Sequence, residues 1–293
     1  MPDRIGNAGL LASYLTRGAL IEPLVDPKPG AVTRRKGHGD MDIYMFMVAS
    51  SCLYPSLVSI ASDGCRDGVL GKGFKLYTAC VEESIGSRNV NTGTALLLLV
   101  LMKGALVSRR VEDAVSSARY FVEACSGSVD GYYYYKMLRL GGRSYMGRYY
   151  GPLPDIREFK NTPSLYRILS LTSWDLVHRE ILESYRVSMN IVEKLNAAGV
   201  SEDSLLRILL DILAEYGDTL IARKFGWRAY YRAMAEARQA LALSKSIGVR
   251  EALLWLDSLW RPRKWSPGAV LDLLASGISL YYLGKYYELN EQY

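Results

Sequence analysis

The chain has 293 residues, of which 49% are hydrophobic and 23% are charged, as is ordinary for a soluble globular protein with a sizeable core. Its longest apolar run, residues 95–102, is far shorter than the roughly 20 residues of a membrane-spanning helix, so no membrane partner is expected. The net charge of +6 suits an anionic partner such as a nucleotide, a coenzyme or RNA, without choosing among them.

The four cysteines, Cys52, Cys65, Cys80 and Cys125, form no CxxC pair, and the two histidines lie far apart, so we expect no zinc site. The mostly apolar surroundings of the cysteines predict reduced, packed thiols in a cytoplasmic protein. The N-terminus shows no signal-peptide pattern, in keeping with that location. Only two glutamines occur, which favours a heat-adapted source.

Apolar residues recur with helical spacing along most of the chain. The first predicted helix contains Leu10, Leu11, Tyr14, Leu15 and Leu20. The others span residues 41–61, 92–107, 111–124, 165–172, 176–195, 204–214, 227–246 and 267–283. No alternating strand pattern competes with them. We therefore predict an all-α fold, a single-domain multi-helix bundle of residues 1–293 with motif loops at helix N-termini.

Residues 26–42, DPKPGAVTRRKGHGDMD, place cations beside two carboxylates before a predicted helix. Lys28 and Gly30 lie in a stiff proline-rich turn that can approach a phosphate closely, with Arg34 as a further cation. Asp40 and Asp42 at the helix start predict a magnesium site, because magnesium commonly takes one or two carboxylates plus substrate phosphates. The alternative is that Asp40 only caps the helix and Asp42 favours its dipole.

Residues 87–99, SRNVNTGTALLLL, form a polar turn that leads into an apolar helix. Asn89 and Asn91 can bond sugar hydroxyls or base edges, Gly93 permits close approach, and a helix start favours an anion. Ordinary asparagine capping is the alternative.

Residues 216–226, YGDTLIARKFG, are a short polar connection between two helices. Asp218 is a candidate base or metal ligand, and Arg223 and Lys224 are candidate phosphate partners. A capped turn with solvated charges is the alternative.

Residues 261–274 contain another helix start suited to anions, with Ser266 before a proline and Gly268 after it. Asp272 follows among apolar residues, and a buried aspartate is costly unless it is paired or bound to a metal. Pairing with a core arginine is the commoner case.

Residues 131–151 contain seven tyrosines, four cations and no acids. Aromatic residues among cations suit base stacking, so RNA binding is a second hypothesis. The alternative is a helix packed on the core, followed by a glycine-rich loop. No P-loop, dinucleotide fingerprint, GxSxG or HExxH motif occurs.

Four segments in this order resemble the triphosphoribosyl-dephospho-CoA synthase family: Glu22…Lys28-Pro29-Gly30…Asp40-Met41-Asp42, Asn89-Val90-Asn91-Thr92-Gly93, Asp218-Thr219 and Ser266-Pro267-Gly268…Asp272-Leu273-Leu274. The resemblance implies an all-helical enzyme that transfers the triphosphoribosyl part of ATP to a ribose hydroxyl of dephospho-CoA and releases adenine. It also implies that Glu22, Lys28, Asp40, Asp42, Asn89, Asp218 and Asp272 occupy the family's motif positions.

The chain departs from the family pattern at several positions. The family's Asn-Thr-His-Lys-Gly has lost its histidine and lysine at Asn91 and Thr92, and its Asp-Thr-Asn element ends in Leu220. Lys264 replaces an asparagine and Ala269 a second glycine. The departures suggest a divergent branch of the family, archaeal in origin, in which the donor or the acceptor differs.

We therefore expect a transferase that uses ATP and magnesium and acts on dephospho-CoA or another nucleotide-like acceptor. Asp40 and Asp42 would bind magnesium, and Glu22 or Asp218 would be the base. The predicted substrate-binding residues are Lys28, Gly30, Arg34, Asn89, Asn91, Gly93, Arg223, Lys224, Ser266, Gly268 and Asp272. A homodimer is compatible with the sequence, and nucleic acid is not the expected partner. A catalytically inactive nucleotide-binding relative is the third hypothesis.

Overall fold

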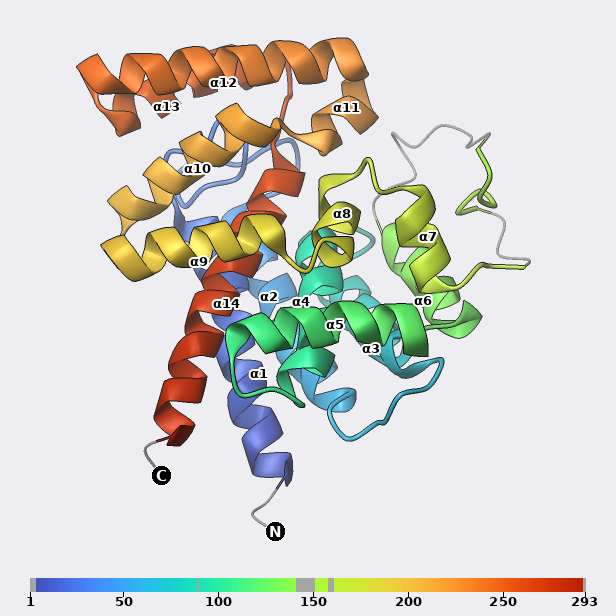
Figure 1. The fold of residues 1–293 in the computed structure, drawn as a ribbon. Helices are drawn as coiled ribbons and strands as arrows, with labels where there is room; N and C mark the ends of the chain where they lie inside the picture. The colour runs from blue at the N-terminus through green and yellow to red at the C-terminus, as the bar shows by residue number, and fades with distance from the viewer. Residues whose placement is uncertain (1–3, 89, 141–150, 158–160, 292–293) are drawn as a thin grey trace.

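A computed structural model describes residues 4–88, 90–140, 151–157 and 161–291, and this part of the chain is all-α, as predicted (Figure 1). Within these residues it forms fourteen α-helices, one short 3-10 helix and no sheet. The helices are α1 (Arg4–Ile21), η1 (Glu22–Leu24), α2 (Ile43–Ser59), α3 (Val69–Ile85), α4 (Thr92–Ala105), α5 (Val111–Cys125), α6 (Ser128–Leu138), α7 (Leu165–Leu171), α8 (Leu176–Leu182), α9 (Arg186–Ala198), α10 (Glu202–Tyr216), α11 (Thr219–Phe225), α12 (Trp227–Ile247), α13 (Val249–Trp260) and α14 (Gly268–Glu291).

The long helix α14 packs antiparallel to α1 along the middle of the molecule, so both termini lie at the same end (Figure 1). Gly18 permits this contact, because a Cβ there would lie 1.9 Å from the Ala275 carbonyl oxygen. Ser279 Oγ donates to the Leu15 carbonyl at 2.6 Å across the same contact. The apolar helix α4 packs against α14 and is buried along nearly its whole length.

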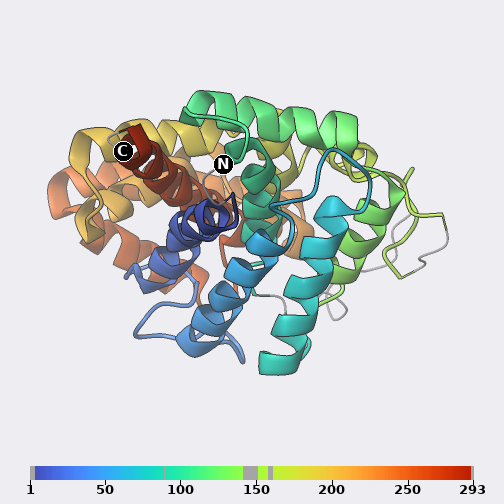
Figure 2. The ribbon, with the colours of Figure 1, turned by 90° about the horizontal axis from the view of Figure 1, so that it is seen from below.

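Helices α1, α2 and α3 follow one another across the face seen in Figure 2. The sequence pattern missed α3, which contains Gly71 and Gly73. A Cβ at Gly71 would lie 3.0 Å from Tyr133, and one at Gly73 would lie 2.7 Å from Leu99. These glycines lower helix propensity, but they allow close packing of the neighbouring helices.

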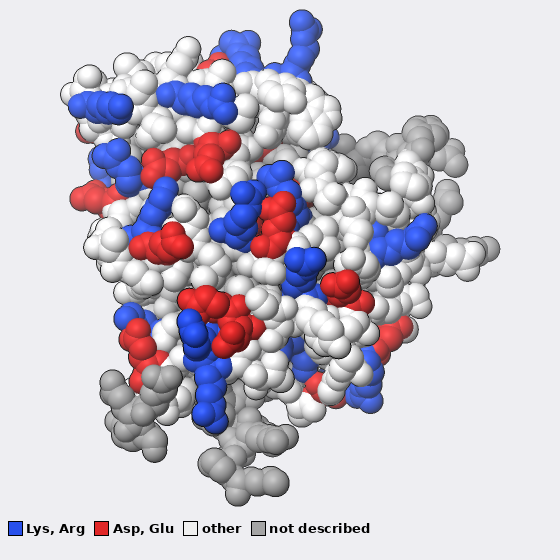
Figure 3. Space-filling model, in the orientation of Figure 1, with Lys and Arg blue, Asp and Glu red and all other residues white. Residues whose placement is uncertain are grey.

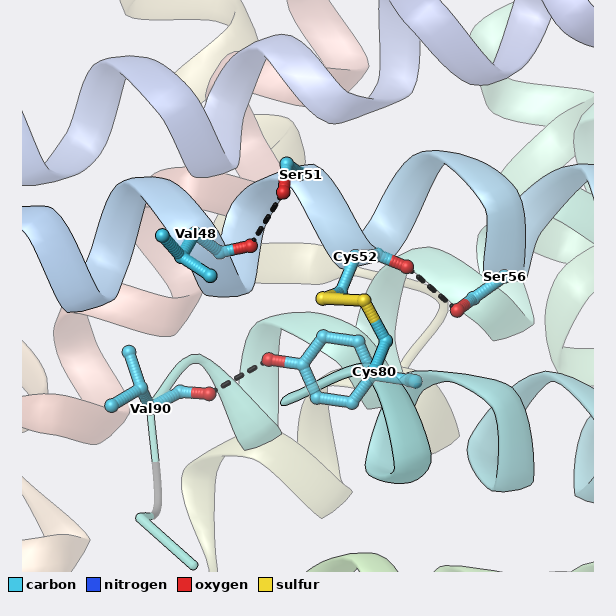
Figure 4. Close-up of a disulfide and its surroundings, with 7 residues drawn as sticks. Val48, Ser51, Cys52, Ser56, Cys80 and Val90 are labelled. Atoms are coloured by element: carbon cyan, nitrogen blue, oxygen red, sulfur yellow. Dashed lines mark hydrogen bonds between the residues drawn. A yellow bond between two sulfur atoms is a disulfide. The ribbon is translucent and has the colours of Figure 1, made fainter. Parts of the chain in front are cut away.

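The prediction of reduced thiols was wrong, because all four cysteines form disulfides. Cys52 of α2 bonds Cys80 of α3, as Figure 4 shows, and Cys65 bonds Cys125 at the end of α5. The Cα–Cα distances are 5.8 and 5.0 Å, although 28 and 60 residues of sequence separate the partners. Helix packing brings the partners together, so the spacing of the cysteines in the sequence does not predict the pairing.

The helix predicted for residues 176–195 is divided into α8 and α9. Ser184 and Tyr185 have φ angles of 53° and 61°, which a continuing helix cannot contain. The buried Glu180 side chain accepts from the backbone N–H groups of Val187 and Ser188 and so caps α9. Leu176, Val177 and Ile181 still follow helical spacing, which is why periodicity alone missed the break.

The sequence pattern also missed α13, which packs beside α12 at the top of Figure 1. The tyrosine-rich stretch begins in α6, where Tyr134 and Tyr135 are buried in the core. Residues 141–150, which continue the stretch, lie outside the described residues. RNA binding by the stretch is therefore not tested by the structure. No described helix is long and apolar enough to cross a membrane.

Candidate active site

The N-terminal ends of α2, α4, α8 and α14 border a cavity of about 930 Å³, together with η1 and parts of α3, α6 and α11. This volume lies at the upper end of the range for ligand pockets, about 300–1,000 Å³. Ten of the predicted residues line it: Glu22, Lys28, Asp40, Asn91, Gly93, Arg223, Lys224, Ser266, Gly268 and Asp272. The fold therefore gathers residues that are up to 250 positions apart in the sequence.

Glu22 and Lys28 form a buried ion pair at the cavity wall, with Nζ 2.5 Å from Oε1. Lys28 Nζ also donates to the Glu22 carbonyl at 3.0 Å. Burial lowers the pKa of Lys28, while Glu22 opposes that change. An ammonium held inside the wall in this way can face a phosphate, and the paired carboxylate can face a sugar.

The rest of the cationic loop is anchored to α13 by the buried Asp257. Its carboxylate accepts from Gly30 N at 2.8 Å, from Lys36 Nζ at 3.0 Å and from Arg261. A Cβ at Gly30 would lie 1.8 Å from the Trp265 carbonyl oxygen, so this glycine serves chain packing. Gly30 is not part of the cavity lining.

Arg34 also lies away from the cavity, because its guanidinium donates to Glu202 at 2.9 Å on the surface. Both charge signs are mixed over the face seen in Figure 3, where no single-sign surface dominates. Most of the opening loop's cations therefore fix the loop, and Lys28 is the one that reaches the cavity.

The two aspartates at the start of α2 differ in position. Asp42 is the N-cap of α2 and accepts from Met45 N at 3.0 Å, and it does not line the cavity. Asp40 lines the cavity mouth, and its carboxylate accepts from Arg88 Nε at 3.1 Å. This hydrogen bond holds the pKa of Asp40 below its usual value. The structure thus brings one member of the pair to the site.

Asp272 of α14 meets the start of α4 deep in the cavity. Its Oδ1 accepts from the backbone and the hydroxyl of Thr94, at 2.9 and 2.6 Å. A Cβ at Gly93 would lie 2.1 Å from Oδ2, so only glycine fits beside this carboxylate. Burial raises the pKa of Asp272 to about 7, and Glu22 and Asp218 add to the rise.

Asn91 sits at the N-cap of α4 with a left-handed φ of 56°. Its side-chain amide donates to Ser50 Oγ at 2.9 Å, and the residue lines the cavity. Asn89 lies outside the described residues.

Asp218 is buried behind the cavity wall rather than in it. It caps α11 by accepting from Leu220 N and Ile221 N, and its other oxygen accepts from Val270 N at 2.8 Å. Burial raises its pKa to about 6. The carboxylate therefore joins α11 to the start of α14 and fixes the place of Ser266 and Gly268.

Arg223 and Lys224 of α11 supply positive charge to the cavity wall. Arg223 lies 3.4 Å from the buried carboxylate of Asp175. The pKa of Lys224 is lowered by burial and by the neighbouring Arg223. The pKa of His38, another lining residue, is lowered by burial and then by Lys224.

Sequence reasoning missed Tyr134, Asp175 and His178, which also line the cavity. Tyr134 Oη lies 2.5 Å from His178 Nε2, and Asp175 caps α8 by accepting from Val177 N. The available signal was the Asp-x-x-His spacing of residues 175–178, where the predicted helix begins.

A concave site with buried carboxylates, several cations and a long helix N-terminus facing it is typical of an enzyme that binds a polyanion such as a nucleotide. The chain belongs to the ATP:dephospho-CoA triphosphoribosyl transferase family, CitG, whose model matches residues 8–291. It is accordingly a transferase of this family, as the resemblance predicted.

Two relatives agree with this family. A protein from Malonomonas rubra, assigned as a 2-(5''-triphosphoribosyl)-3'-dephosphocoenzyme-A synthase, is 23% identical over 314 residues, covering 94% of this chain and 88% of its own. A crystal structure of a protein assigned as a triphosphoribosyl-dephospho-CoA synthase from Archaeoglobus fulgidus has a TM-score of 0.67 at 18% identity. The match covers 83% of this chain and 99% of that one, and it supports the fold.

Proposed function

We propose that the chain binds ATP and dephospho-CoA in this cavity and transfers the triphosphoribosyl group to a hydroxyl of the acceptor, releasing adenine. The observation that supports this most is that the motif residues Glu22, Lys28, Asp40, Gly93 and Asp272 line one cavity. A cavity of about 930 Å³ is large enough for parts of two nucleotides to meet.

The triphosphate would lie against Lys28, Arg223, Lys224 and the start of α14 at Ser266 and Gly268. The cations provide charge-assisted hydrogen bonds, and the N–H groups of a helix start favour an anion. Lys224 and Arg223 would replace the charge that the family's lysine supplies where this chain has Thr92, which also lines the cavity.

The sugar would lie deeper, beside Asn91 and Asp272. Oδ2 of Asp272 has no hydrogen-bond partner among the described side chains and backbone groups, so it can accept from a ribose hydroxyl. Displacement of adenine places positive character on the ribose, as in glycoside cleavage, and the Glu22 carboxylate would stabilise it.

The described residues contain no cluster of three or more acidic, histidine or cysteine side chains that could hold a metal alone. A magnesium ion would therefore be held by the Asp40 carboxylate at the cavity mouth, which now pairs with Arg88, together with oxygens of the proposed triphosphate. When bound, the ion would neutralise phosphate charge. Asp42 serves α2 as a cap, so we assign the metal to Asp40. The cytoplasmic location, the homodimer and the single domain remain predictions.

The direct test is incubation with ATP, magnesium and dephospho-CoA, followed by measurement of free adenine. We expect adenine release that requires both the metal and the acceptor. Binding of ATP without adenine release would support the inactive relative instead. If ATP does not bind at millimolar concentration, the proposed function fails.

A further inference from the structure

A chain of hydrogen bonds in the cavity wall has no part in the function proposed above. Tyr134 Oη lies 2.5 Å from His178 Nε2, and His178 Nδ1 lies 2.7 Å from Thr172 Oγ1. The Thr172 hydroxyl donates to the Ile168 carbonyl at 2.6 Å. These side chains come from α6, from α8 and from the end of α7, and both Tyr134 and His178 line the cavity.

The direction of each bond follows from the number of protons available. Thr172 gives its only hydroxyl proton to Ile168, so it accepts from His178, and Nδ1 must carry the imidazole proton. Burial lowers the pKa of His178, which keeps the ring neutral at neutral pH. Nε2 is then an acceptor for the Tyr134 hydroxyl, and the Tyr134 oxygen retains lone pairs for a donor in the cavity.

Charged groups on the surrounding elements act on this pair. Asp175, at the start of α8, favours a protonated His178, and Arg223 of α11 opposes it. The pKa of Tyr134 is raised well above its ordinary value, mainly by burial and next by Asp175, with a smaller contribution from Asp272 of α14. Tyr134 therefore keeps its proton unless His178 receives it at the same time.

We propose that Tyr134 accepts the proton of the acceptor hydroxyl and passes its own proton to His178, an inference that rests on the proposed function. As the acceptor oxygen bonds to the anomeric carbon of ATP, its proton moves to Tyr134 Oη and the Tyr134 proton moves to His178 Nε2. The bond from that carbon to adenine breaks, and its electron pair leaves with adenine. The proton then returns by the same route to adenine, which departs neutral.

This arrangement assigns separate tasks to the three side chains. Tyr134 touches the substrate and is the catalytic residue. His178 holds the proton, and Thr172 positions His178 by fixing its tautomer. Glu22 suits proton abstraction less well, because Lys28 holds its carboxylate at 2.5 Å.

The first test compares Tyr134→Phe with Tyr133→Phe, a matched change at the next position of α6, which does not contribute to the described cavity lining. General base catalysis is typically worth about 10²–10⁴-fold. We expect Tyr134→Phe to lower the rate of adenine release by about that factor while the Kd for ATP stays within about twofold. Tyr133→Phe should keep the parent rate.

The second test follows the proton. In the parent, the rate should fall as pH drops through the pKa of His178, below its ordinary value of about 6.5. This acidic limb should be absent from the residual activity of His178→Gln. The chain has only two histidines, so ¹⁵N NMR of the imidazoles, assigned with that variant, should show His178 protonated at Nδ1 at pH 7.

A His178 ring protonated at Nε2, or a Tyr134→Phe enzyme with the parent's rate and pH profile, would overturn the inference. The tautomer is read in the NMR spectrum of the parent, and a variant serves only to assign its two imidazoles. If His178→Gln does not fold, His38→Gln gives the same assignment by elimination. If the parent itself releases no adenine, the proposed function fails first. If the parent is active and both Tyr134→Phe and His178→Gln keep its rate and pH profile, the proposed function stands. Only the proton relay is then rejected.

Discussion

The position of a cation in the opening loop decides whether it reaches the cavity. Lys28, Arg34 and Lys36 are close in sequence, yet Lys28 lines the cavity while Arg34 and Lys36 pair with Glu202 and Asp257. A surface ion pair contributes little to stability, but here the pairs hold the loop that carries Lys28. Individual residues in this loop therefore either line the cavity or anchor the chain.

The first residue-scale prediction concerns Asp40. Asp40→Asn should weaken magnesium-dependent ATP binding at least tenfold, because it removes the carboxylate proposed to hold the ion. Asp42→Asn is a matched control two residues away, since asparagine caps a helix about as well as aspartate. Titration calorimetry with and without magnesium measures both. Equal losses in the two variants would restore the paired site that the sequence predicted.

The second residue-scale prediction concerns Lys224. Lys224→Ala should weaken ATP binding by about 1.5–3 kcal/mol, the scale of a hydrogen bond to a charged group. Lys245→Ala, at an exposed position near the end of α12, removes the same charge without touching the cavity lining. Calorimetry with ATP and a monophosphate would follow both variants. A silent Lys224→Ala, with the monophosphate competing well, would show that the ligand carries less charge.

At the scale of elements, helix ends determine the site. Asp175 caps α8, and Asp218 caps α11 while also bonding the first turn of α14. Asn91 holds the N-cap position of α4, but its side chain bonds Ser50 and makes no cap hydrogen bond. The structure confirms the cap that the alternative gave Asp218, but not its solvated charges, because Arg223 and Lys224 line the cavity. The cap does not make Asp218 irrelevant, because the bond to Val270 places the start of α14 at the cavity.

The element-scale prediction concerns the disulfides. In the chain-entropy model, cross-links that close 28 and 60 residues stabilise by about 3.5 and about 4 kcal/mol. Cys65 is exposed whereas Cys52 is buried, so mild reductant should open Cys65–Cys125 first. Thiol labelling with mass analysis gives the order, and urea unfolding gives the loss of stability.

The matched variants are Cys65→Ser with Cys125→Ser, and Cys52→Ser with Cys80→Ser. Labelling of Cys52 and Cys80 before the other pair would contradict the predicted order. The heat-adapted source stays a prediction from the composition.

At the scale of the whole molecule, two carboxyl groups at and behind the cavity wall lower stability when they are ionised. Burial raises the pKa of Asp272 to about 7 and that of Asp218 to about 6, above the ordinary value of 3.8. Such groups bind more protons in the folded state between about pH 4 and 7. The stability that their protonated forms contribute is complete below the unfolded pKa of about 3.8. It is lost as the pH rises through the folded pKa of each group.

The whole-molecule prediction is that Asp272→Asn raises the Tm by several degrees at pH 8 and by much less at pH 5, where the parent carboxyl is protonated. Asparagine can keep the bonds from Thr94, so the change removes charge with little loss of packing. Calorimetric scans at both pH values measure it, alongside weaker substrate binding. An equal rise at pH 5 and pH 8 would assign the effect to packing instead.

The sequence alone determined the helical class and the family, because both depend on local patterns. Helical spacing survives in any tertiary context, and motifs such as Lys28-Pro29-Gly30 and Asp40-Met41-Asp42 are contiguous. The helix predictions failed where a local signal was ambiguous. Glycines hid α3, and the positive φ angles at Ser184 and Tyr185 are not visible in an apolar pattern.

Only the tertiary structure decided which motif residues share a site. Asp40 and Asp42 are equivalent in sequence, but one faces the cavity and the other caps α2. Cys65 meets Cys125, and Tyr134 meets His178, through the packing of helices that are distant along the chain. A side chain's role depends on what surrounds it in space, and these contacts are long-range, so no local pattern specifies them.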